Sequence, residues 1–247
     1  MRRGAFVFLL MLSAIIVAGG SSQRMGSDKL FALVAGELVI AHAIRAFARA
    51  TSVSEIIVVA REDRHDEIQK LSRDAGFTKL HSIVPGGERR QDSVQAGLDA
   101  IDPKAEYVAV HDAARPLIMP EQIERAFEQC RVYGAAALAH PVNDTLKRAD
   151  ADLLVVGAVD RNQLYAMETP QIFARKLIED AYRGVYAQSI SVTDEVSAVE
   201  QLGHKVVLIL NDDLNFKITY PRDLPFAELV LRQRKDSAAT TRVGNRR

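Results

Sequence analysis

The chain contains an apolar run that leads directly into a glycine-rich, cationic turn: LSAIIVAGGSSQRMGSDK, from Leu12 to Lys29. The first seven residues, Leu12–Ala18, are almost entirely apolar, which is typical of a strand buried on both faces of a parallel sheet. Sheets of this kind bind their ligands beyond the carboxyl ends of the strands. The sequence therefore predicts a strand over Leu12–Ala18 and a ligand-binding turn immediately after it.

The turn itself has the composition of an anion site. Gly19 and Gly20 let the backbone approach a ligand closely, and successive N–H groups in such a turn can bind an anion. Arg24 and Lys29 add two positive charges nearby. The turn is neither the G-x-G-x-x-G dinucleotide fingerprint nor a P-loop. Ala18, Gly19 and Gly20 with the two cations therefore indicate a polyphosphate site; a plain glycine turn with solvated charges is the alternative.

Strand-like runs alternate with amphipathic segments along the rest of the chain. Apolar residues recur at i, i+4 and i+7 over Ile40–Phe47 and Val94–Ile101, as in a helix with one buried face. The further apolar runs are Glu55–Ala60, His81–Val84, Tyr107–His111, Ala135–His140 and Lys205–Leu210. This alternation predicts an α/β fold with a doubly wound, mostly parallel sheet. We expect one domain over residues 11–231, a frayed, polar and basic tail over 232–247, and an extension over 1–10.

Composition excludes several classes of protein. The 247 residues are 48% hydrophobic and 26% charged, which is ordinary for a globular protein. Lys and Arg together number 32, as do Asp and Glu, so the formal net charge is zero and no large nucleic-acid surface is implied. The single cysteine, Cys130, excludes a disulfide framework. It falls in an apolar helical stripe with Ile123 and Phe127, which predicts a buried thiol.

The N-terminus resembles a secretory signal, because Met1-Arg2-Arg3 precedes an apolar run. The run is too short for a comfortable membrane span, which needs about 20 apolar residues. Cleavage after Ala18 would remove the strand that presents the glycine turn. We therefore expect a cytoplasmic protein without a membrane partner, in which Met11 can serve as the start; a membrane-anchored form is the alternative.

The run YVAVHDAARP, from Tyr107 to Pro116, places an acidic residue at the end of a strand. Mg²⁺ prefers one or two carboxylates together with phosphate oxygens and water, and Asp112 is well placed to supply one. An Asp112–Arg115 ion pair that fixes the turn is the alternative interpretation. His111 faces away from Asp112 by strand alternation and is expected to be a core histidine.

The loop PGGERRQDS, from Pro85 to Ser93, joins the third strand to a helix. Gly86 and Gly87 again permit close backbone approach. Ser93 or Asp92 can cap the helix, or the loop and Ser93 can contact a nucleotide base. Both interpretations are open from the residues alone.

Three later segments complete the set. Residues 141–161 are polar and then apolar, which suggests a hairpin-like excursion from the main sheet. Thr193-Asp194-Glu195 has the composition of a helix start, with Thr193 or Asp194 as its cap. Asn215–Thr219 is a short strand-like run that carries Lys217.

Taken in order, these motifs resemble the 2-C-methyl-D-erythritol 4-phosphate cytidylyltransferases, nucleotidyltransferases of the non-mevalonate isoprene pathway. The resemblance runs from about Leu12 to Glu228. Its later motifs are Val142-x-Asp-Thr-x-Lys-Arg148, Val159-Asp-Arg-Asn162, Thr169-Pro-Gln-x-Phe173, Thr193-Asp-Glu-x-Ser197 and Phe216-Lys-Ile-Thr219. The opening departs from the family, which usually has Pro-Ala-Ala-Gly where this chain has Val17-Ala18-Gly19-Gly20.

The resemblance implies a Rossmann-like nucleotidyltransferase fold. It also implies transfer of CMP from CTP to 2-C-methyl-D-erythritol 4-phosphate, which gives 4-diphosphocytidyl-2-C-methyl-D-erythritol and pyrophosphate, with Mg²⁺ (or another divalent cation) on Asp112. The implied catalytic residues are Arg24, Lys29, Asp112 and Lys217. The implied nucleotide-binding residues are Ala18, Gly19, Gly20, Arg24, Lys29, Gly87, Glu88, Ser93, Asp112 and Ala113. The implied residues for the second substrate are Arg115, Thr145, Arg161, Thr169, Thr193 and Lys217. The 141–161 arm is implied to form a homodimer, with Thr145 and Arg161 serving the neighbouring active site.

Three other functions compete with this one. Ribitol-5-phosphate cytidylyltransferase, or another sugar-phosphate nucleotidyltransferase, would perform the same chemistry on a different acceptor. A nucleotide-dependent oxidoreductase would need the G-x-G-x-x-G fingerprint that the chain lacks. A non-catalytic nucleotide-binding module would not need Arg24, Lys29, Asp112 and Lys217 together.

Overall fold

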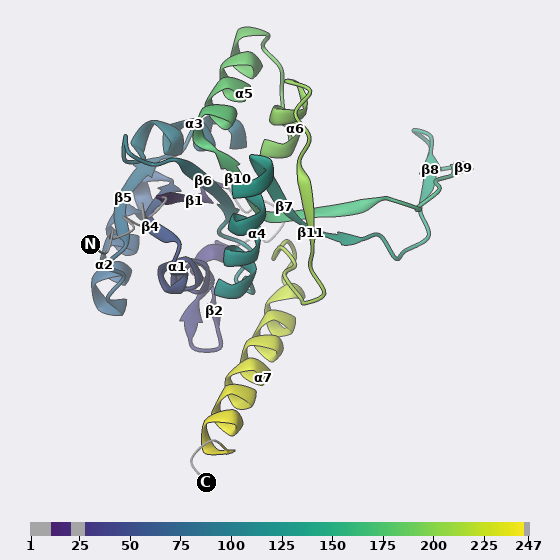
Figure 1. The fold of residues 1–247 in the computed structure, drawn as a ribbon. Coiled ribbons are helices and arrows are strands. Elements are labelled where there is room, and N and C mark those ends of the chain that lie inside the picture. Colours follow the sequence, from purple (N-terminus) through teal and green to yellow (C-terminus); the bar gives the residue numbers. More distant parts are fainter. Residues whose placement is uncertain (1–10, 21–27, 245–247) are drawn as a thin grey trace, which may run out of the picture.

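A single seven-stranded sheet forms the centre of the molecule, with strand order β11-β7-β10-β6-β1-β4-β5 (Figure 1). The structure is a computed structural model that describes residues 11–20 and 28–244. The strands are β1 (Leu12–Ala18), β4 (Val53–Ala60), β5 (Leu80–Pro85), β6 (Tyr107–Asp112), β7 (Ala135–Pro141), β10 (Tyr165–Ala174) and β11 (Val207–Leu210). The predicted first strand is confirmed at both ends, and the five apolar runs from Glu55–Ala60 to Lys205–Leu210 are confirmed as strands with ends shifted by one or two residues.

The sheet is mostly parallel, as predicted, but it contains one antiparallel strand that the sequence did not indicate. Strand β10 pairs antiparallel with both β6 and β7, while β1 pairs parallel with β4 and β6. The register of β10 against β7 shifts between Met167 and Gln171, so Glu168-Thr169-Pro170 interrupts the pairing. Pro170 has no N–H for the ladder, which explains why no regular strand pattern is visible there.

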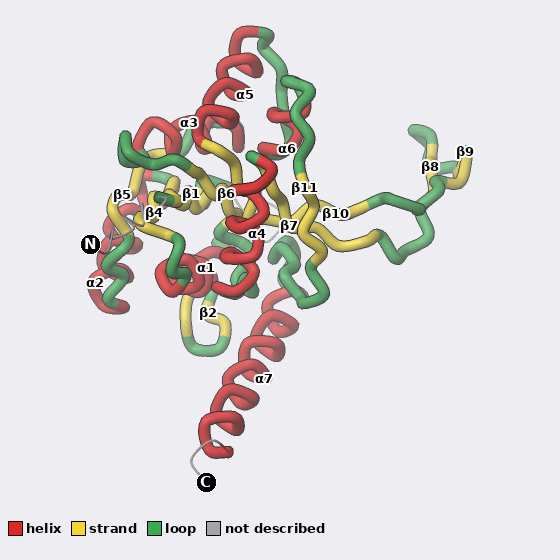
Figure 2. Tube along the Cα trace, in the orientation of Figure 1, coloured by secondary structure: helices red, strands yellow, loops and turns green. Residues whose placement is uncertain are grey.

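Helices cover both faces of the sheet, as a doubly wound fold requires (Figures 1 and 2). The helices are α1 (Val39–Arg49), α2 (His65–Ala75), α3 (Arg90–Ala100), α4 (Pro120–Tyr133), α5 (Arg175–Ala187), α6 (Glu195–Glu200) and α7 (Asp223–Gly244). Alternate residues of β1 enter different cores: Ile16 packs with α1 and α4, and Ile15 packs with α3 and α5. Cys130 is fully buried in the first core, as predicted, and burial raises the pKa of its thiol to about 12.

The register of the central strands brings three predicted motifs to one edge of the sheet. Val17 is the partner of Asp112, and the N–H of Ala113 donates to the Val17 carbonyl at 3.0 Å. On the other side Ala18 pairs with Ala60, which in turn pairs with Pro85 at the end of β5. The glycine turn after β1, the Gly86-Gly87 loop and Asp112 therefore lie side by side.

The 141–161 segment is a hairpin that projects from the body of the molecule, as predicted (Figure 1). Its two strands, β8 (Lys147–Ala149) and β9 (Val155–Ala158), pair only with each other. A second small hairpin, β2 (Leu33–Val34) with β3 (Glu37–Leu38), precedes α1.

The expectation of a frayed tail from Arg232 onward is wrong for most of that segment. Helix α7 continues without a break through Gly244, and Arg232 pairs with Glu228 one turn earlier. Arg234 donates to the carbonyl of Leu117 at 2.6 Å, which ties this part of the helix to the domain. Across residues 11–20 and 28–244, no helix combines the length and apolar character that crossing a bilayer requires.

Candidate active site

Asp112 lies at the centre of a charged cluster at the carboxyl edge of the sheet. It is the last residue of β6, and its side chain is 11% exposed. One carboxylate oxygen accepts a hydrogen bond from Lys217 Nζ at 2.8 Å, and the other accepts from Arg90 Nε at 3.1 Å. The two cations thus come from segments more than a hundred residues apart: Arg90 from the start of α3, and Lys217 from the loop before α7.

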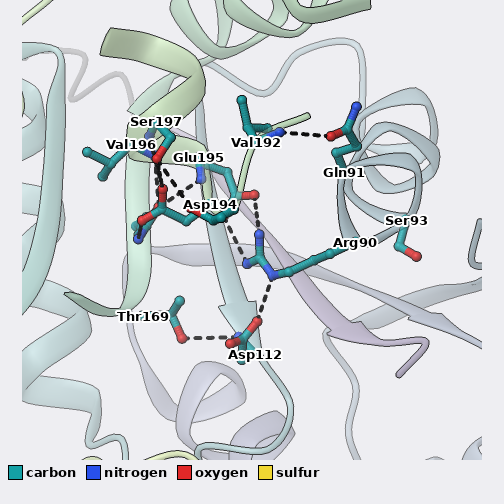
Figure 3. Close-up of polar contacts among 12 residues, drawn as sticks. Arg90, Gln91, Ser93, Asp112, Thr169, Val192, Asp194, Glu195, Val196 and Ser197 are labelled. Carbon is teal, nitrogen blue, oxygen red and sulfur yellow. Dashed lines mark hydrogen bonds and ion pairs between the residues drawn. The ribbon is translucent and has the colours of Figure 1, made fainter. Parts of the chain in front are cut away.

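Arg90 is held in place by a second carboxylate. Its two terminal nitrogens donate to the two oxygens of Glu195 at 2.6 and 3.0 Å, which is the fork geometry of a strong charge-assisted pair (Figure 3). Glu195 is fully buried at the start of α6, and the Tyr182 hydroxyl donates to it at 2.9 Å. Arg90 therefore joins α3 and α6 to the end of β6.

The charges in this cluster keep Asp112 ionised. Burial by itself raises the pKa of a carboxyl group, but Arg90 and Lys217 outweigh it and hold the pKa of Asp112 well below its usual range. Burial also opposes the charge on Arg90, yet Glu195 and Asp112 together raise the Arg90 pKa. The side chain of Lys217 is 39% exposed, so its ammonium group borders solvent while it holds Asp112.

Thr169 positions the backbone of Asp112 from the neighbouring strand. Its hydroxyl accepts from the Asp112 N–H at 3.1 Å and lies 3.0 Å from His111 Nδ1 (Figure 3). The Nε2 of His111 lies 3.1 Å from the Arg115 carbonyl, so Nε2 carries the proton and Nδ1 accepts from Thr169. The core position predicted for His111 is confirmed: the ring is fully buried against Phe47, and burial lowers its pKa to about 4.

The segment that carries Lys217 is not the strand that the sequence suggested. Residues 211–219 are an irregular loop, which single hydrogen bonds to side chains and backbone of the domain hold in place without strand pairing. Asn215 donates to Glu168 at 2.9 Å and to the Thr169 carbonyl at 3.0 Å. Arg115 donates to the carbonyls of Asn215 and Met167 at 2.8 and 3.1 Å. Arg115 thus anchors the lysine loop to β10.

The two glycine segments pack closely around Ser93. A Cβ atom on Gly86 would lie 2.9 Å from the Ser93 hydroxyl, and one on Gly19 would lie 3.1 Å from it. A Cβ on Gly87 would collide with Asp92 at 2.4 Å, so only glycine fits there. The Ser93 hydroxyl accepts from the Gly87 N–H at 3.2 Å and thereby fixes the loop next to the β1 turn.

The helix that begins in this loop is capped by Asp92. Its carboxylate accepts from the backbone N–H of Arg89, the residue before the helix, at 3.0 Å. The N-cap position itself is held by Arg89, so Asp92 acts on it from the third helical position, and the Ser93 hydroxyl bonds to Gly87 instead. Glu88 and Gly87 are exposed at the tip of the loop, whereas Ala18 and Ala113 are buried beneath it.

Thr193 lies on an exposed loop whose position is set by two glutamines. Gln171 accepts from the N–H groups of Glu195 and Val196 at 3.1 and 3.0 Å, and Gln91 accepts from Val192 at 3.1 Å (Figure 3). The cap of α6 is Asp194, which accepts from the Ser197 N–H at 3.0 Å. Thr193 itself is left at the surface.

The remaining predicted site residues are dispersed. Arg24 and part of the predicted glycine turn lie outside the described residues. Lys29 opens the short 3-10 helix η2 (Lys29–Phe31) beyond that turn. Thr145 and Arg161 are exposed on the projecting arm, where Arg161 donates to the Asn143 carbonyl, and the arm carries both away from Asp112 (Figure 1).

Sequence reasoning missed Arg90 and Glu195 as site residues. Both stood inside quoted motifs, Arg90 in the Pro85–Ser93 loop and Glu195 in the predicted helix start. The signal that singles them out is their pairing, which joins positions 105 residues apart and leaves no local pattern.

Comparison with known proteins decides the family. The sequence profile of the IspD family, 2-C-methyl-D-erythritol 4-phosphate cytidylyltransferase, matches residues 12–233. The chain belongs to this cytidylyltransferase family. A cytidylyltransferase of that name from Caldanaerobacter subterraneus is 40% identical over 225 residues, which are 90% of this chain and 99% of that protein. A chloroplastic cytidylyltransferase from Oryza sativa is 36% identical and is covered to 75% of its length.

Solved structures of cytidylyltransferases share the fold. The crystal structure of 4-diphosphocytidyl-2C-methyl-D-erythritol synthase from Anaerococcus prevotii superposes with a TM-score of 0.79 at 31% identity, covering 91% of this chain and 97% of that one. A cytidylyltransferase structure from Thermus thermophilus gives a TM-score of 0.74 at 28% identity, with coverage of 89% and 98%. The α/β nucleotidyltransferase architecture predicted from the sequence is therefore confirmed.

Proposed function

We propose that the chain transfers CMP from CTP to 2-C-methyl-D-erythritol 4-phosphate and releases pyrophosphate. The observation that carries this proposal is the Asp112 carboxylate, held between Lys217 and Arg90 beside the two glycine segments, in a chain that belongs to the cytidylyltransferase family. Relatives at 36–40% identity carry that enzyme name.

The reaction chiefly requires charge neutralisation and alignment. A phosphate oxygen of the sugar alcohol attacks the α-phosphorus of CTP, a new P–O bond forms, and the bond to the β-phosphate breaks. Both reactants are polyanions, so fixed cations and N–H groups must compensate for their repulsion and for the charge that grows in the transition state. A phosphate dianion needs no general base, which agrees with a site that lacks a free histidine beside Asp112.

The nucleotide belongs on the two glycine segments. Ala18, Gly19 and Gly20, with Arg24 and Lys29, would hold the triphosphate, because strand ends with small residues admit phosphates to backbone N–H groups. Gly87, Glu88 and Ser93 would frame the cytosine and ribose. Support comes from Gly20, which is exposed and has no atom of the described residues within 4 Å of the place where a Cβ would stand, so its backbone is accessible.

The sugar-alcohol phosphate belongs on the opposite side of Asp112. Lys217 and the exposed Thr193 can reach it directly. The bonds of Arg115 and Thr169 point to supporting roles, because both residues are engaged in holding the lysine loop and Asp112. Thr145 and Arg161 would act on the neighbouring subunit of a homodimer formed through the 141–161 arm. Exposed Leu153, Leu154 and Val155 on that arm support such an interface.

The cluster suits a divalent cation that binds mainly through the substrate. Within residues 11–20 and 28–237, no three His, Cys, Asp or Glu side chains gather to hold a metal by themselves. Mg²⁺ needs only one or two carboxylates when phosphate oxygens and water complete its shell. Ionised Asp112 would be the protein ligand. When bound, the cation supplies Lewis-acid stabilisation of the phosphates, and Lys217 and Arg90 orient the carboxylate that holds it.

A coupled assay of pyrophosphate release tests the proposal. The full-length chain would be incubated with CTP, Mg²⁺ and either 2-C-methyl-D-erythritol 4-phosphate or ribitol 5-phosphate. We expect kcat/KM to be at least about tenfold higher with the methylerythritol compound, because a site built for one polyol rejects another. Faster release with ribitol 5-phosphate would establish the rival enzyme. No release with either acceptor would contradict the proposal.

We further propose that the protein acts in the cytoplasm. This is supported by the use of Leu12–Ala18 as a central strand, paired on both sides, rather than as a removable segment. Fractionation of the native cells with N-terminal sequencing of the protein tests it: recovery from the membrane fraction would contradict it.

A further inference from the structure

A cavity of about 360 Å³ lies apart from the Asp112 cluster, between α1, the Pro116–Pro120 segment and α7. None of the residues that line it belongs to the nucleotide or acceptor sites described above. The segment Pro116–Pro120 forms its wall on the side of the sheet, and Leu231, Arg234 and Lys235 of α7 form another wall. Arg234 and Lys235 reach the cavity because α7 continues past Arg232.

The lining of this cavity is strongly cationic. Arg45, Arg49, Arg234 and Lys235 line it, and Glu37 is the only carboxylate among the lining residues. His42 also lines it, and burial lowers the pKa of that ring, which leaves it neutral at pH 7. The lining thus carries three more positive than negative charges, in a chain whose formal net charge is zero.

Part of this charge is not compensated by the protein. Glu37 pairs with Arg45 at 2.9 Å, and Arg234 pairs with Asp213 at 2.8 Å. Lys235 donates one hydrogen bond, to the Ala35 carbonyl at 3.2 Å. The side chain of Arg49 makes no hydrogen bond or ion pair with any residue in the described part of the chain. Arg49 and Lys235 therefore retain unused donors where they border the cavity.

The start of α4 adds to the positive potential. Met119 and Pro120, at the N-terminal end of this 14-residue helix, line the cavity. The N-terminus of a helix carries a partial positive charge. This contribution supports the side-chain charges and does not define the site alone.

We propose that this cavity binds a small organic phosphate that carries a second acidic group. The two cations without an acidic partner among the described residues, Arg49 and Lys235, match a phosphate dianion, and the positive end of α4 favours the second acidic group. Arginine is well suited to phosphate because its planar fork donates two parallel hydrogen bonds. The volume lies near the lower end for ligand sites, so a compact metabolite fits better than a nucleotide.

Isothermal titration calorimetry with 3-phosphoglycerate tests this site. CTP and Mg²⁺ would be present throughout at saturating concentration, so that the nucleotide site is occupied. We expect one saturable binding event in the wild-type chain. Arg49→Glu should weaken it at least tenfold, and Arg49→Gln should weaken it less, because only the first reverses the charge. Glycerate, which lacks the phosphate, should show no saturable binding.

Arg131→Glu is the matched control. Arg131 is an exposed arginine in the last turn of α4, as Arg49 is in the last turn of α1, so both changes carry the same charge and the same helix-end penalty. It lies at the far end of α4 from the cavity. Binding that is absent in the wild type, or equal in Arg49→Glu and Arg131→Glu, would overturn the proposal. The measurement needs no turnover, so such a result would leave the cytidylyltransferase proposal intact.

Discussion

Asp112 combines burial with permanent ionisation, and this combination sets the chemistry available at the site. A carboxylate that is 11% exposed is costly to ionise unless cations accompany it. Lys217 and Arg90 donate hydrogen bonds to the two oxygens of Asp112 and neutralise its charge, and Glu195 prevents Arg90 from turning toward solvent. The carboxylate is therefore fixed in position before any substrate arrives.

Loss of the Lys217 ammonium group should impair turnover more than folding. Lys217→Ala is expected to lower kcat by about 10²–10³, the scale for removing one preorganised electrostatic group. Asp112 keeps its pair with Arg90, so the thermal midpoint should change little. Steady-state pyrophosphate release checks this. Lys205→Ala changes an exposed lysine of the preceding segment and is the control, which should retain full activity. If Lys217→Ala has the same kcat as this control, the Lys217 ammonium group has no role in turnover.

Burial of His111 predicts a loss of stability in acid. The pKa of His111 is lowered to about 4 in the folded state, against about 6.5 when unfolded, so the unfolded state binds more protons between these values. The contribution of His111 to the free energy of unfolding is fully present above pH 6.5 and decreases as the pH drops toward 4. Between pH 7.5 and 5.0 the loss should be about 2 kcal/mol.

Urea unfolding at the two pH values measures this effect. In His111→Asn the pH-dependent loss should shrink by about that amount, whatever the variant's stability at pH 7.5. An unchanged pH dependence in the variant would show that other groups cause the acid sensitivity.

Individual residues were predictable where the motif is local. His111 and Asp112 stood out because a strand end is visible in the sequence, whereas Lys217 was indicated as a site residue only by the resemblance to the family. Arg90 did not, because the two arginines of the Gly86–Ser93 loop are equivalent in the sequence. Only the fold shows that Arg89 pairs with Asp92 within its own helix, while Arg90 crosses to Asp112 and Glu195.

At the level of elements, α7 connects the segment that follows Asp112 with the loop that carries Lys217. Arg234 donates to the carbonyl of Leu117, five residues after Asp112, and to Asp213 and Leu214 in the loop that bears Lys217. One arginine thus spans the segments that must stay in register for Lys217 to meet Asp112.

Arg234→Ala should therefore reduce kcat by about 10- to 100-fold while the protein stays folded, because small misplacements of catalytic groups are costly. Arg232→Ala is the matched control: Arg232 belongs to the same helix, but its ion pair with Glu228 is exposed and should contribute under about 1 kcal/mol. Circular dichroism confirms folding, and pyrophosphate release gives kcat. Equal activity of the two variants would refute the connecting role of Arg234.

Elements with a continuous apolar pattern were predicted well, and those defined by partners were not. Strand β1 is apolar on both faces, so its limits are visible in the sequence. Strand β10 is interrupted at Glu168-Thr169-Pro170, where the side chains of Glu168 and Thr169 bond to Asn215 and to the N–H of Asp112 in place of regular strand pairing. The C-terminal part of α7 was expected to fray because its anchor, Arg234, binds backbone carbonyls that no sequence pattern reveals.

For the whole molecule, the projecting arm is the feature that a single chain leaves unexplained. Leu153 is 84% exposed there, and the arm projects away from the central sheet (Figure 1). An exposed apolar hairpin of this kind normally marks a protein interface. The proposed homodimer would cover it and deliver Arg161 to the neighbouring site.

Complementation between inactive variants tests this arrangement. Lys217→Ala and Arg161→Ala chains, each expected to have low activity, would be co-expressed. In a symmetric dimer, half of the random pairs would be mixed and would contain one intact site, so activity should recover to about a quarter of wild type. Recovery that stays at the level of the separate variants would place both residues in the same site or exclude the dimer.

The most direct test of the central claim is a crystal structure with CTP and Mn²⁺ in place of Mg²⁺. We expect the triphosphate to lie over the turn after β1 with cytosine near Ser93, and an anomalous peak from Mn²⁺ beside the Asp112 carboxylate and the α-phosphate. CTP bound elsewhere, with no Mn²⁺ at Asp112, would contradict the account.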